Sequence, residues 1–223
     1  RDAGNMRMYR AYRKWILHVW DLKGSSETWK SQLEKYYAQQ PVFALVGGLG
    51  ETSWKPIHEF AESAEIPSLF PQVNLPLLTG ENNYNFYFTR GITLEAEVVA
   101  KFLRDRGELT NIVQVYRPES AGQAAANSFQ KALPSGTVAK EVVLTGPADE
   151  VFWNTVSSLK PESLVLWLGA SDLEKAALLG NPNAKPVYVS FSQMGERLTL
   201  GAIPSGTNVR MIYPSDLPPK HAS

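Results

Sequence analysis

The stretch PVFALVGGLGETSWKPIHEF, residues 41–60, decides the fold. Its apolar residues 42–46 predict a short buried strand, and the glycines over residues 47–50 predict a tight turn. Ser53 can cap the helix that follows, and Pro56 lies in its first turn, where a missing N–H costs nothing. A strand that passes through glycines into a capped helix is typical of α/β proteins. The free N–H groups at such a helix start can also bind an anion.

Apolar segments of strand length alternate with amphipathic segments of helix length along the rest of the chain. This alternation predicts repeated βα units on parallel sheets that helices cover on both faces. The predicted strands are residues 15–22, 42–46, 67–70, 84–88, 112–116, 138–144, 164–168, 187–191 and 209–213. Six helices are predicted. The first runs from Ser25 to Pro41, the second begins after Ser53, and the third contains Leu94, Val98 and Phe102 and ends near Gly107. The fourth begins at Ser120, the fifth begins at Asp149, and the sixth spans residues 173–179.

The composition excludes several classes of protein. The 223 residues contain 22 Lys and Arg against 22 Asp and Glu, and no basic cluster is present to attract a nucleic acid. The absence of cysteine excludes disulfides, thiolate zinc sites and iron–sulfur clusters. No apolar run approaches the roughly 20 residues that span a bilayer. Because the chain begins with a polar segment and without Met, we expect a processed or excised piece of a longer protein.

The glycine turn leaves three interpretations open: a site for a carboxylate or small polar ligand, a dinucleotide site, and a purely structural turn. The pattern Gly48-x-Gly50-x-x-Ser53 is close to the dinucleotide fingerprint, but the next predicted strand ends in Phe70 without the acidic residue that the fingerprint needs. Trp54 directly follows the cap, and it lines a ligand site or packs in the core.

The sequence does not contain the complete signature of any other enzyme class that we considered. The segment HEFAE, residues 58–62, begins like a zinc-protease helix but has Glu62 where the second histidine is needed. No nucleophile elbow and no phosphate-binding loop of the Walker type occur. We interpret His18 and His58 as structural side chains, so the residues support neither a catalytic nor a metal site.

Three blocks in a fixed order resemble the type I periplasmic binding-protein fold. They are residues 42–53 with the glycine turn, residues 66–70 with a strand after Pro67, and residues 86–91 at the transition to a second lobe. The chain is most similar to the Leu/Ile/Val-type, or branched-chain amino-acid, substrate-binding proteins of ABC transporters. The resemblance covers residues 15–213.

The resemblance implies two Rossmann-like three-layer α/β/α lobes with parallel sheets, truncated at both ends. It places lobe 1 at residues 1–85, lobe 2 at residues 86–208, and a hinge or return segment at residues 209–223. The irregular segment 71–83, rich in Pro, Gly and Asn, is where a chain can leave one sheet for another.

The resemblance also implies a ligand held between the lobes, at the carboxyl ends of the strands. Thr52 and Ser53 match the hydroxyl residues that hold the ligand's carboxylate. An acid from the second lobe holds the α-ammonium group in the family, and Asp172 or Glu196 would serve here. The full set of candidate ligand-binding residues is Gly50, Thr52, Ser53, Trp54, Val73, Asn74, Ser120, Gly122, Ala170, Ser171 and Ser192.

The implied function is non-enzymatic binding of a branched-chain amino acid or related small carboxylate, without a cofactor, in the periplasm. The implied partners are the small-molecule ligand and an ABC permease. Several phrases, including residues 66–71 and 213–218, are also similar to a subgroup joined to c-type cytochrome modules. The alternative is therefore a sensory or interaction domain of the same fold that has lost its transport ligand and is fused to or partners a cytochrome c module.

Overall fold

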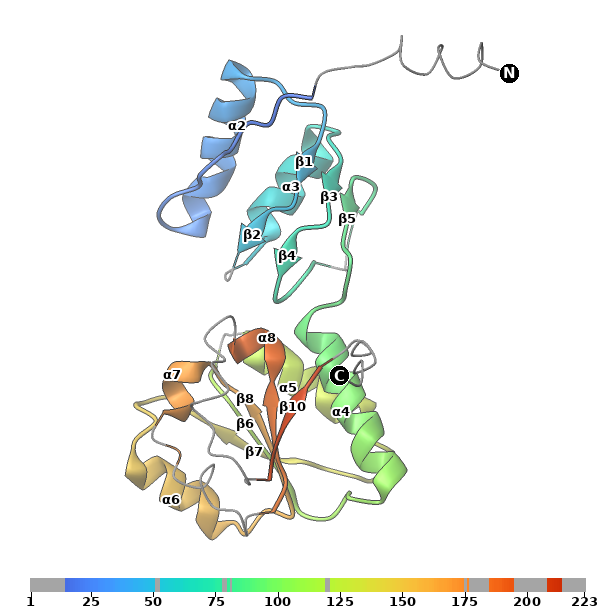
Figure 1. Cartoon of the computed structure of the whole chain (residues 1–223), viewed down its shortest axis with the longest axis vertical. Helices are drawn as coiled ribbons and strands as arrows, with labels where there is room; N and C mark the ends of the chain where they lie inside the picture. The colour runs from blue at the N-terminus through green and yellow to red at the C-terminus, as the bar shows by residue number, and fades with distance from the viewer. Residues whose placement is uncertain are drawn as a thin grey trace, which may run out of the picture.

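The computed structural model describes residues 15–50, 53–77, 80, 82–118, 121–174, 176, 185–194 and 208–213. They form two bodies joined by the chain that leads from β5 to α4 (Figure 1). We call the body from η1 to β5 lobe 1 and the body from α4 to β10 lobe 2. The sequence predicted that lobe 1 ends at residue 85 and lobe 2 begins at residue 86. These two residues form β5, which pairs with β3 of lobe 1, and the lobe boundary stays a prediction.

Lobe 1 packs two helices against short parallel strands. Its elements are η1 (Ser26–Thr28), α2 (Trp29–Gln39), β1 (Leu45–Val46), β2 (Leu49–Gly50), α3 (Lys55–Ser63), β3 (Ser68–Leu69), β4 (Gln72–Val73) and β5 (Asn85–Phe86). The strands form a three-stranded sheet in the order β1-β3-β5 and a two-stranded sheet of β2 and β4. A core that includes Leu33, Ile57 and Phe60 joins the two helices to the sheets.

The segment 15–22, which we predicted to be a strand, pairs with no described strand. Much of it is exposed, including Leu17 and Val19, whereas Trp20 stacks on Tyr36 of α2 with ring centroids 5.6 Å apart. A strand exists only when a neighbour supplies its backbone hydrogen bonds. The prediction of a strand from this apolar run is therefore wrong within the described residues.

Lobe 2 is a five-stranded parallel sheet with helices on both faces (Figure 1). Its strand order is β10-β9-β8-β6-β7, and β6, β8 and β9 are buried along their whole length, as expected for a sheet covered on both sides. The elements are α4 (Ile92–Arg106), β6 (Ile112–Tyr116), α5 (Ala121–Ala132), β7 (Lys140–Val143), α6 (Glu150–Ser158), β8 (Ser163–Trp167), α7 (Ala170–Leu173), β9 (Val187–Ser190), α8 (Phe191–Met194) and β10 (Val209–Ile212).

Helix α4 buries a different face from the one we predicted. This helix was predicted from the apolar series Leu94, Val98 and Phe102, which would form an inward face, but Ala96 and Leu103 are fully buried and Phe102 is 38% exposed. The whole buried face comprises Ile92, Glu95, Ala96, Val99, Ala100 and Leu103. An apolar stripe at three-to-four spacing fits either side of a helix with many apolar residues, and packing against α5 and the sheet selects one of them.

The strands of both lobes end toward the junction between the lobes. In Figure 1 the carboxyl ends of β2 and β4 point toward lobe 2. Helices α7 and α8, which follow β8 and β9, lie on the side of lobe 2 that faces lobe 1. In the described residues, no helix is both long enough and apolar enough to cross a membrane.

Candidate functional site

On the lobe 1 side, the glycine turn forms a small parallel sheet that the sequence did not reveal. Gly50 of β2 is in register with Val73 of β4, and the Gln72 N–H donates to the Gly48 carbonyl at 2.7 Å. The indole of Trp54 lies over this turn, and a Cβ built on Gly48 would come within 2.5 Å of the ring. Glycine is therefore required here by the close approach of the ring to the backbone.

Trp54 belongs to the core of lobe 1, with 6% of its surface exposed. Its indole Nε1 is buried and has no hydrogen-bond partner among the described residues. Ser53, directly before it, is exposed, and its Oγ accepts from the Lys55 N–H at 3.4 Å. The N-cap residue of α3 is Trp54, which makes no side-chain cap bond, so the prediction of Ser53 at the cap is wrong. Gly50, Ser53 and Trp54 thus lie together beside Val73 at the end of the β2–β4 sheet, whereas Thr52 lies outside the described residues.

Asn74 connects the two lobes through its backbone. Its carbonyl accepts from the Ile92 N–H at 2.9 Å, which satisfies a free donor at the start of α4. The contact requires Gly91, which has a φ of 59° and whose Cβ, if present, would come within 2.3 Å of the Asn74 oxygen. The predicted ligand residue Asn74 therefore also holds the chain where it passes into lobe 2.

On the lobe 2 side, the candidate residues follow neighbouring strands. Ala170 and Ser171 begin α7 directly after β8, and Ser192 lies in α8 directly after β9. Gly122 is buried in the first turn of α5, which follows β6, and Ser120 lies outside the described residues. Because β6, β8 and β9 are adjacent in the sheet, these residues share its carboxyl edge.

The carboxylate of Glu95 accepts hydrogen bonds from the hydroxyl groups at the end of β9. Its side chain is fully buried, and Oε2 accepts from Ser190 Oγ at 2.6 Å. Oε1 accepts from the Ser192 N–H at 3.0 Å and from the Ser192 hydroxyl. Burial raises the pKa of Glu95, and the hydrogen bonds from Ser190 and Ser192 oppose this rise. The predicted ligand residue Ser192 is therefore already engaged with a carboxylate of the chain itself.

Arg117 and Asp172 form a two-point ion pair at the same edge. Arg117 Nε donates to Asp172 Oδ2 at 2.8 Å, and its second terminal nitrogen donates to Oδ1 at 2.7 Å. The side chain of Asp172 is 14% exposed and that of Arg117 is 38% exposed. The hydrogen bond to Asp172 raises the pKa of Arg117 further above its ordinary value. The acid that we predicted for an ammonium group thus has a partner within the chain, and Glu196 lies outside the described residues.

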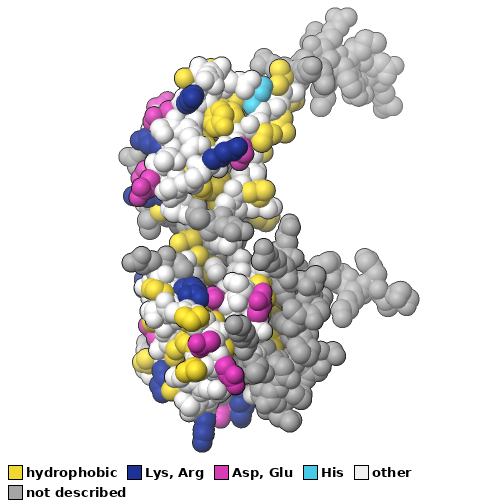
Figure 2. Space-filling view, turned by 90° about the vertical axis from the view of Figure 1, so that its left-hand side faces the viewer, with side chains coloured by type: hydrophobic (Ala, Val, Ile, Leu, Met, Phe, Trp, Pro, Cys, Tyr) yellow, Lys and Arg dark blue, Asp and Glu magenta, His cyan; other side chains and the backbone are white. Residues whose placement is uncertain are grey.

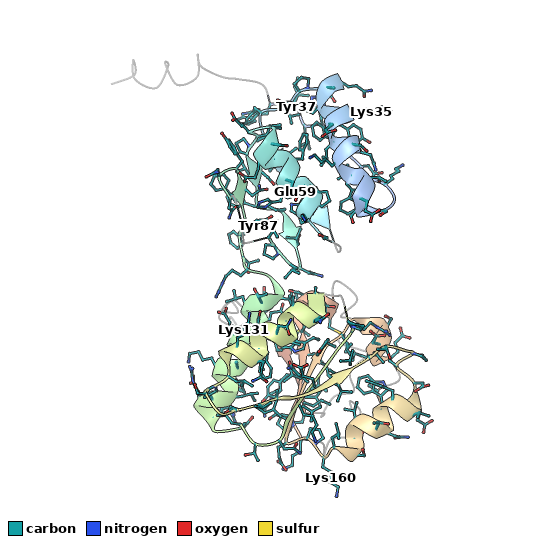
Figure 3. All side chains as sticks on the ribbon, turned by 180° about the vertical axis from the view of Figure 1, so that it is seen from behind. Lys35, Tyr37, Glu59, Tyr87, Lys131 and Lys160 are labelled. Carbon is teal, nitrogen blue, oxygen red and sulfur yellow. The ribbon has the colours of Figure 1, made fainter. Side chains whose placement is uncertain are left out.

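A polar network supports the end of lobe 1. His58 is 3% exposed, and its Nδ1 lies 2.9 Å from the hydroxyl of Tyr87, on the segment after β5 (Figure 3). Burial raises the pKa of Tyr87 to about 12. Burial alone would raise the pKa of Glu62, but hydrogen bonds from Tyr84, Asn85 and Asn83 outweigh it and lower that pKa. Burial and the contact with Tyr87 agree with a structural role for His58, which stays a prediction.

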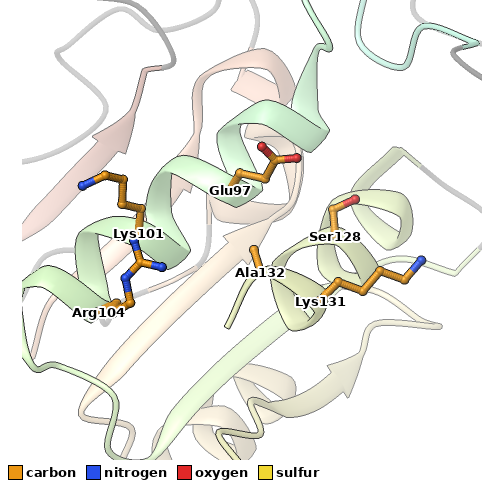
Figure 4. Close-up of a pocket in the computed structure, with 6 residues that line it drawn as sticks. All are labelled: Glu97, Lys101, Arg104, Ser128, Lys131 and Ala132. Atoms are coloured by element: carbon orange, nitrogen blue, oxygen red, sulfur yellow. The ribbon is translucent and has the colours of Figure 1, made fainter. Parts of the chain in front are cut away.

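A groove of about 460 Å³ lies elsewhere, between α4 and α5 (Figure 4). It is lined by Glu97, Lys101 and Arg104 of α4 and by Ser128, Lys131 and Ala132 of α5. Lys101 pairs with Asp105, and Glu97 pairs with Arg90, so much of the charge in the groove is neutralised. None of the candidate ligand residues lines it. Among the described residues, no group of three or more His, Asp or Glu could hold a metal ion.

Arg117 and Glu95 lie at this edge but were not among the residues predicted for it. A signal for Arg117 was available, because it directly follows the predicted strand 112–116 and therefore lies at the carboxyl edge. Glu95 gave no such signal, because it is recognisable as buried only when the packed face of α4 is known.

Solved structures of solute-binding proteins share this fold. A benzoate complex of an ABC-transporter solute-binding protein from R. palustris aligns with a TM-score of 0.66 and 15% identity over 84% of this chain and 54% of that one. An isoleucine complex of a branched-chain amino acid transporter substrate-binding protein from Streptococcus pneumoniae aligns with a TM-score of 0.60 and 18% identity over 82% and 54%. A leucine-binding protein from Thermotoga maritima aligns with a TM-score of 0.59 and 16% identity over 74% and 49%.

The chain spans about half the length of these structural relatives. A comparison with curated proteins found no match. The family model described as periplasmic binding protein matches residues 13–177, which include the glycine turn, the segment between the lobes and most of the lobe 2 sheet. On this match over more than half of its length, the chain belongs to the periplasmic binding protein family.

Proposed function

We propose that this chain is the ligand-binding part of an ABC-transporter substrate-binding protein that holds a small carboxylate between its lobes. The observation that carries the proposal is the placement of two sets of polar groups. Ser53 follows β2 and precedes α3, and Ser171 lies in α7, which follows β8. The start of α3 and helix α7 lie on the sides of the lobes that face each other (Figure 1). In open parallel sheets, ligands bind at this edge.

The proposed binding step needs no covalent chemistry. The N–H groups at the start of α3 and the hydroxyl of Ser53 would hold the carboxylate, because a helix start favours negative charge. Closure of the lobes would then bury the ligand. The ligand complexes of the structural relatives, with benzoate and with isoleucine, support a small carboxylate as the ligand class. The proposal includes a periplasmic location, an ABC permease as partner and no catalytic activity.

The test is a thermal-shift and calorimetric screen of the full-length protein against benzoate, L-leucine and L-isoleucine. A ligand at 100 times its Kd adds about 2.7 kcal/mol to the free energy of unfolding. Ser53→Ala is expected to weaken binding by about tenfold, the effect of losing one hydrogen bond to a charged group. Ser128→Ala, in the groove between α4 and α5, is the matched control and should bind normally.

A protein that binds none of these ligands contradicts the proposal. That result would favour the alternative of a sensory or interaction domain that has lost its transport ligand. Equal binding by the wild type and Ser53→Ala would instead remove Ser53 from the proposed site.

A further inference from the structure

The ion pair between Arg117 and Asp172 determines which charges lobe 2 offers to a ligand. Arg117 follows β6 and Asp172 lies in α7 after β8, and these two strands are neighbours in the sheet. Both carboxylate oxygens of Asp172 accept from the guanidinium, in the parallel geometry that binds a carboxylate most strongly. A ligand ammonium that approached Asp172 would have to displace this arrangement.

Arg117 is itself held in place from the opposite side. Its remaining terminal nitrogen donates to the carbonyl of Gly146 at 3.1 Å and to that of Leu144 at 3.4 Å, in the loop after β7. A guanidinium with three anchored nitrogens is positioned for Asp172 rather than free to swing away. The pair is therefore part of the framework of this edge.

The other acids near this edge that the structure describes are also unavailable or exposed to water, whereas Glu119 and Glu196 lie outside the described residues. Glu95 is fully buried and accepts from Ser190 and Ser192. Asp149 caps α6 by accepting from the Phe152 N–H at 2.9 Å. Glu150 and Glu174 are exposed, so solvent weakens any attraction to a cation. The described part of lobe 2 thus lacks a buried acid that is open to an ammonium group.

The same edge carries an apolar surface. Phe191 and Tyr213 follow the adjacent strands β9 and β10, and their rings meet edge to face with centroids 4.9 Å apart. They are 39% and 40% exposed, so part of each side chain is open to solvent. Aromatic or branched aliphatic groups pack well on such a surface.

We propose that the ligand is a carboxylate with an aromatic or branched apolar tail and no ammonium group, and that Arg117 sets this specificity by occupying Asp172. This inference rests on the proposed function, because it names the ligand class of the same site. Arg117 is a positioning residue here: it acts on the ligand through Asp172.

The test measures calorimetric affinities of the full-length protein for two matched pairs of ligands. The pairs are 3-phenylpropanoate with L-phenylalanine and 4-methylpentanoate with L-leucine, and the members of each pair differ only in the α-ammonium group. The wild type is expected to bind each deaminated acid at least about tenfold more tightly than its amino acid, because the ammonium would lose its hydration without gaining an acid.

Arg117→Gln releases Asp172 and is expected to shift the affinity ratio toward the amino acid by about tenfold or more. Arg104→Gln, on α4 in the groove with α5, is the control and should leave the ratio unchanged. If Arg117→Gln does not fold, Arg117→Lys replaces it, because lysine keeps the charge but cannot make the two-point contact. Partial unfolding of a variant would weaken the binding of both ligands of a pair, so it is not expected to change the affinity ratio.

The possible results distinguish this inference from the proposed function. A wild type that binds the amino acids as tightly as the deaminated acids overturns this inference and leaves the proposed function standing. A wild type that binds neither class overturns both. A wild type that prefers the deaminated acids, with a ratio that neither Arg117 variant changes, overturns the role of Arg117.

Discussion

Glu95 is a carboxylate inside lobe 2 with only neutral donors around it. Its hydrogen bonds to Ser190 and Ser192 connect the first turn of α4 to the end of β9. A buried carboxylate is costly unless such donors are present, because burial removes the water that stabilises its charge. The same donors are the type that the family resemblance implies for a ligand. One side chain of the protein thus uses part of the polar surface that a ligand could have used.

The buried position of Glu95 predicts a specific pH dependence of stability. Burial raises its pKa in the folded state above the ordinary value of 4.5. Between these two pKa values the folded protein binds more protons than the unfolded chain, so the stabilisation present at low pH is lost as the pH rises. We expect the free energy of unfolding of the wild type, relative to Glu95→Gln, to fall as the pH rises above about 4.5.

Urea denaturation of both proteins at a series of pH values measures this difference. Glutamine keeps an acceptor for Ser190 and Ser192 and cannot titrate, so the difference isolates the charge of Glu95. A difference that stays constant from about pH 4 to pH 8 would contradict the assignment of a raised pKa to Glu95.

Helix α4 shows how packing chooses one face of a helix. Leu103 is fully buried between α5 and the sheet, whereas its neighbour Phe102 lies at the surface. The ring of Phe102 is covered by the guanidinium groups of Arg106 and Arg210, at 5.2 and 5.8 Å from its centroid. A large apolar residue at the predicted inward position thus finds cationic partners on the outer surface.

Two neighbouring alanine substitutions test which face of α4 is inward. Leu103→Ala is expected to cost about 2–5 kcal/mol of the free energy of unfolding, because it leaves a cavity in the core. Phe102→Ala is expected to cost less, about 1–2 kcal/mol, because it removes cation–π contacts and the edge contact with Tyr188 at a partly exposed position. Chemical denaturation of both variants measures the costs. The reverse order would restore the predicted face and contradict the structure.

The sheet of lobe 1 has one covered and one open face. Leu45, Ser68 and Asn85 are in register and point toward the helices, whereas the next residues in register, Val46 and Phe86, are 66% and 49% exposed. Further exposed aromatic residues lie near them: Phe43, Phe70 and Phe88. Figure 2 shows hydrophobic side chains on the surface of lobe 1. Parallel sheets are ordinarily covered on both faces, so this open face is an unusually apolar surface for such a sheet.

The open face predicts dye binding by the 223-residue chain. Phe88 is 85% exposed, and Phe88→Ser is expected to lower the binding of an apolar fluorescent dye while changing the free energy of unfolding by less than about 0.5 kcal/mol. Val138→Ser, at a residue of lobe 2 that is 77% exposed, is the matched control and should leave dye binding unchanged. Equal dye binding by the wild type and Phe88→Ser would show that the dye binds elsewhere.

The sequence by itself determined the class of the fold and the alternation of strands and helices along the chain. Strand β6 has the predicted bounds, and Asp149 caps α6 as predicted, because a continuous apolar run and a cap are local signals. The glycine turn also pointed to the part of lobe 1 that contains the candidate site residues Ser53 and Trp54. These features depend on residues close together in the chain, so their pattern is present before folding.

Only the tertiary structure decided which partners each residue finds. The segment 15–22 is an apolar run of strand length that pairs with no strand in the described part of the chain, and β2 and β4 pair although each has only two residues. Arg117 and Asp172 are 55 positions apart, and Glu95 and Ser190 are 95 apart. No local pattern encodes such pairs, because the sheet order brings them together. The availability of an acid or a hydroxyl to a ligand depends on these long-range contacts, which only the folded chain makes.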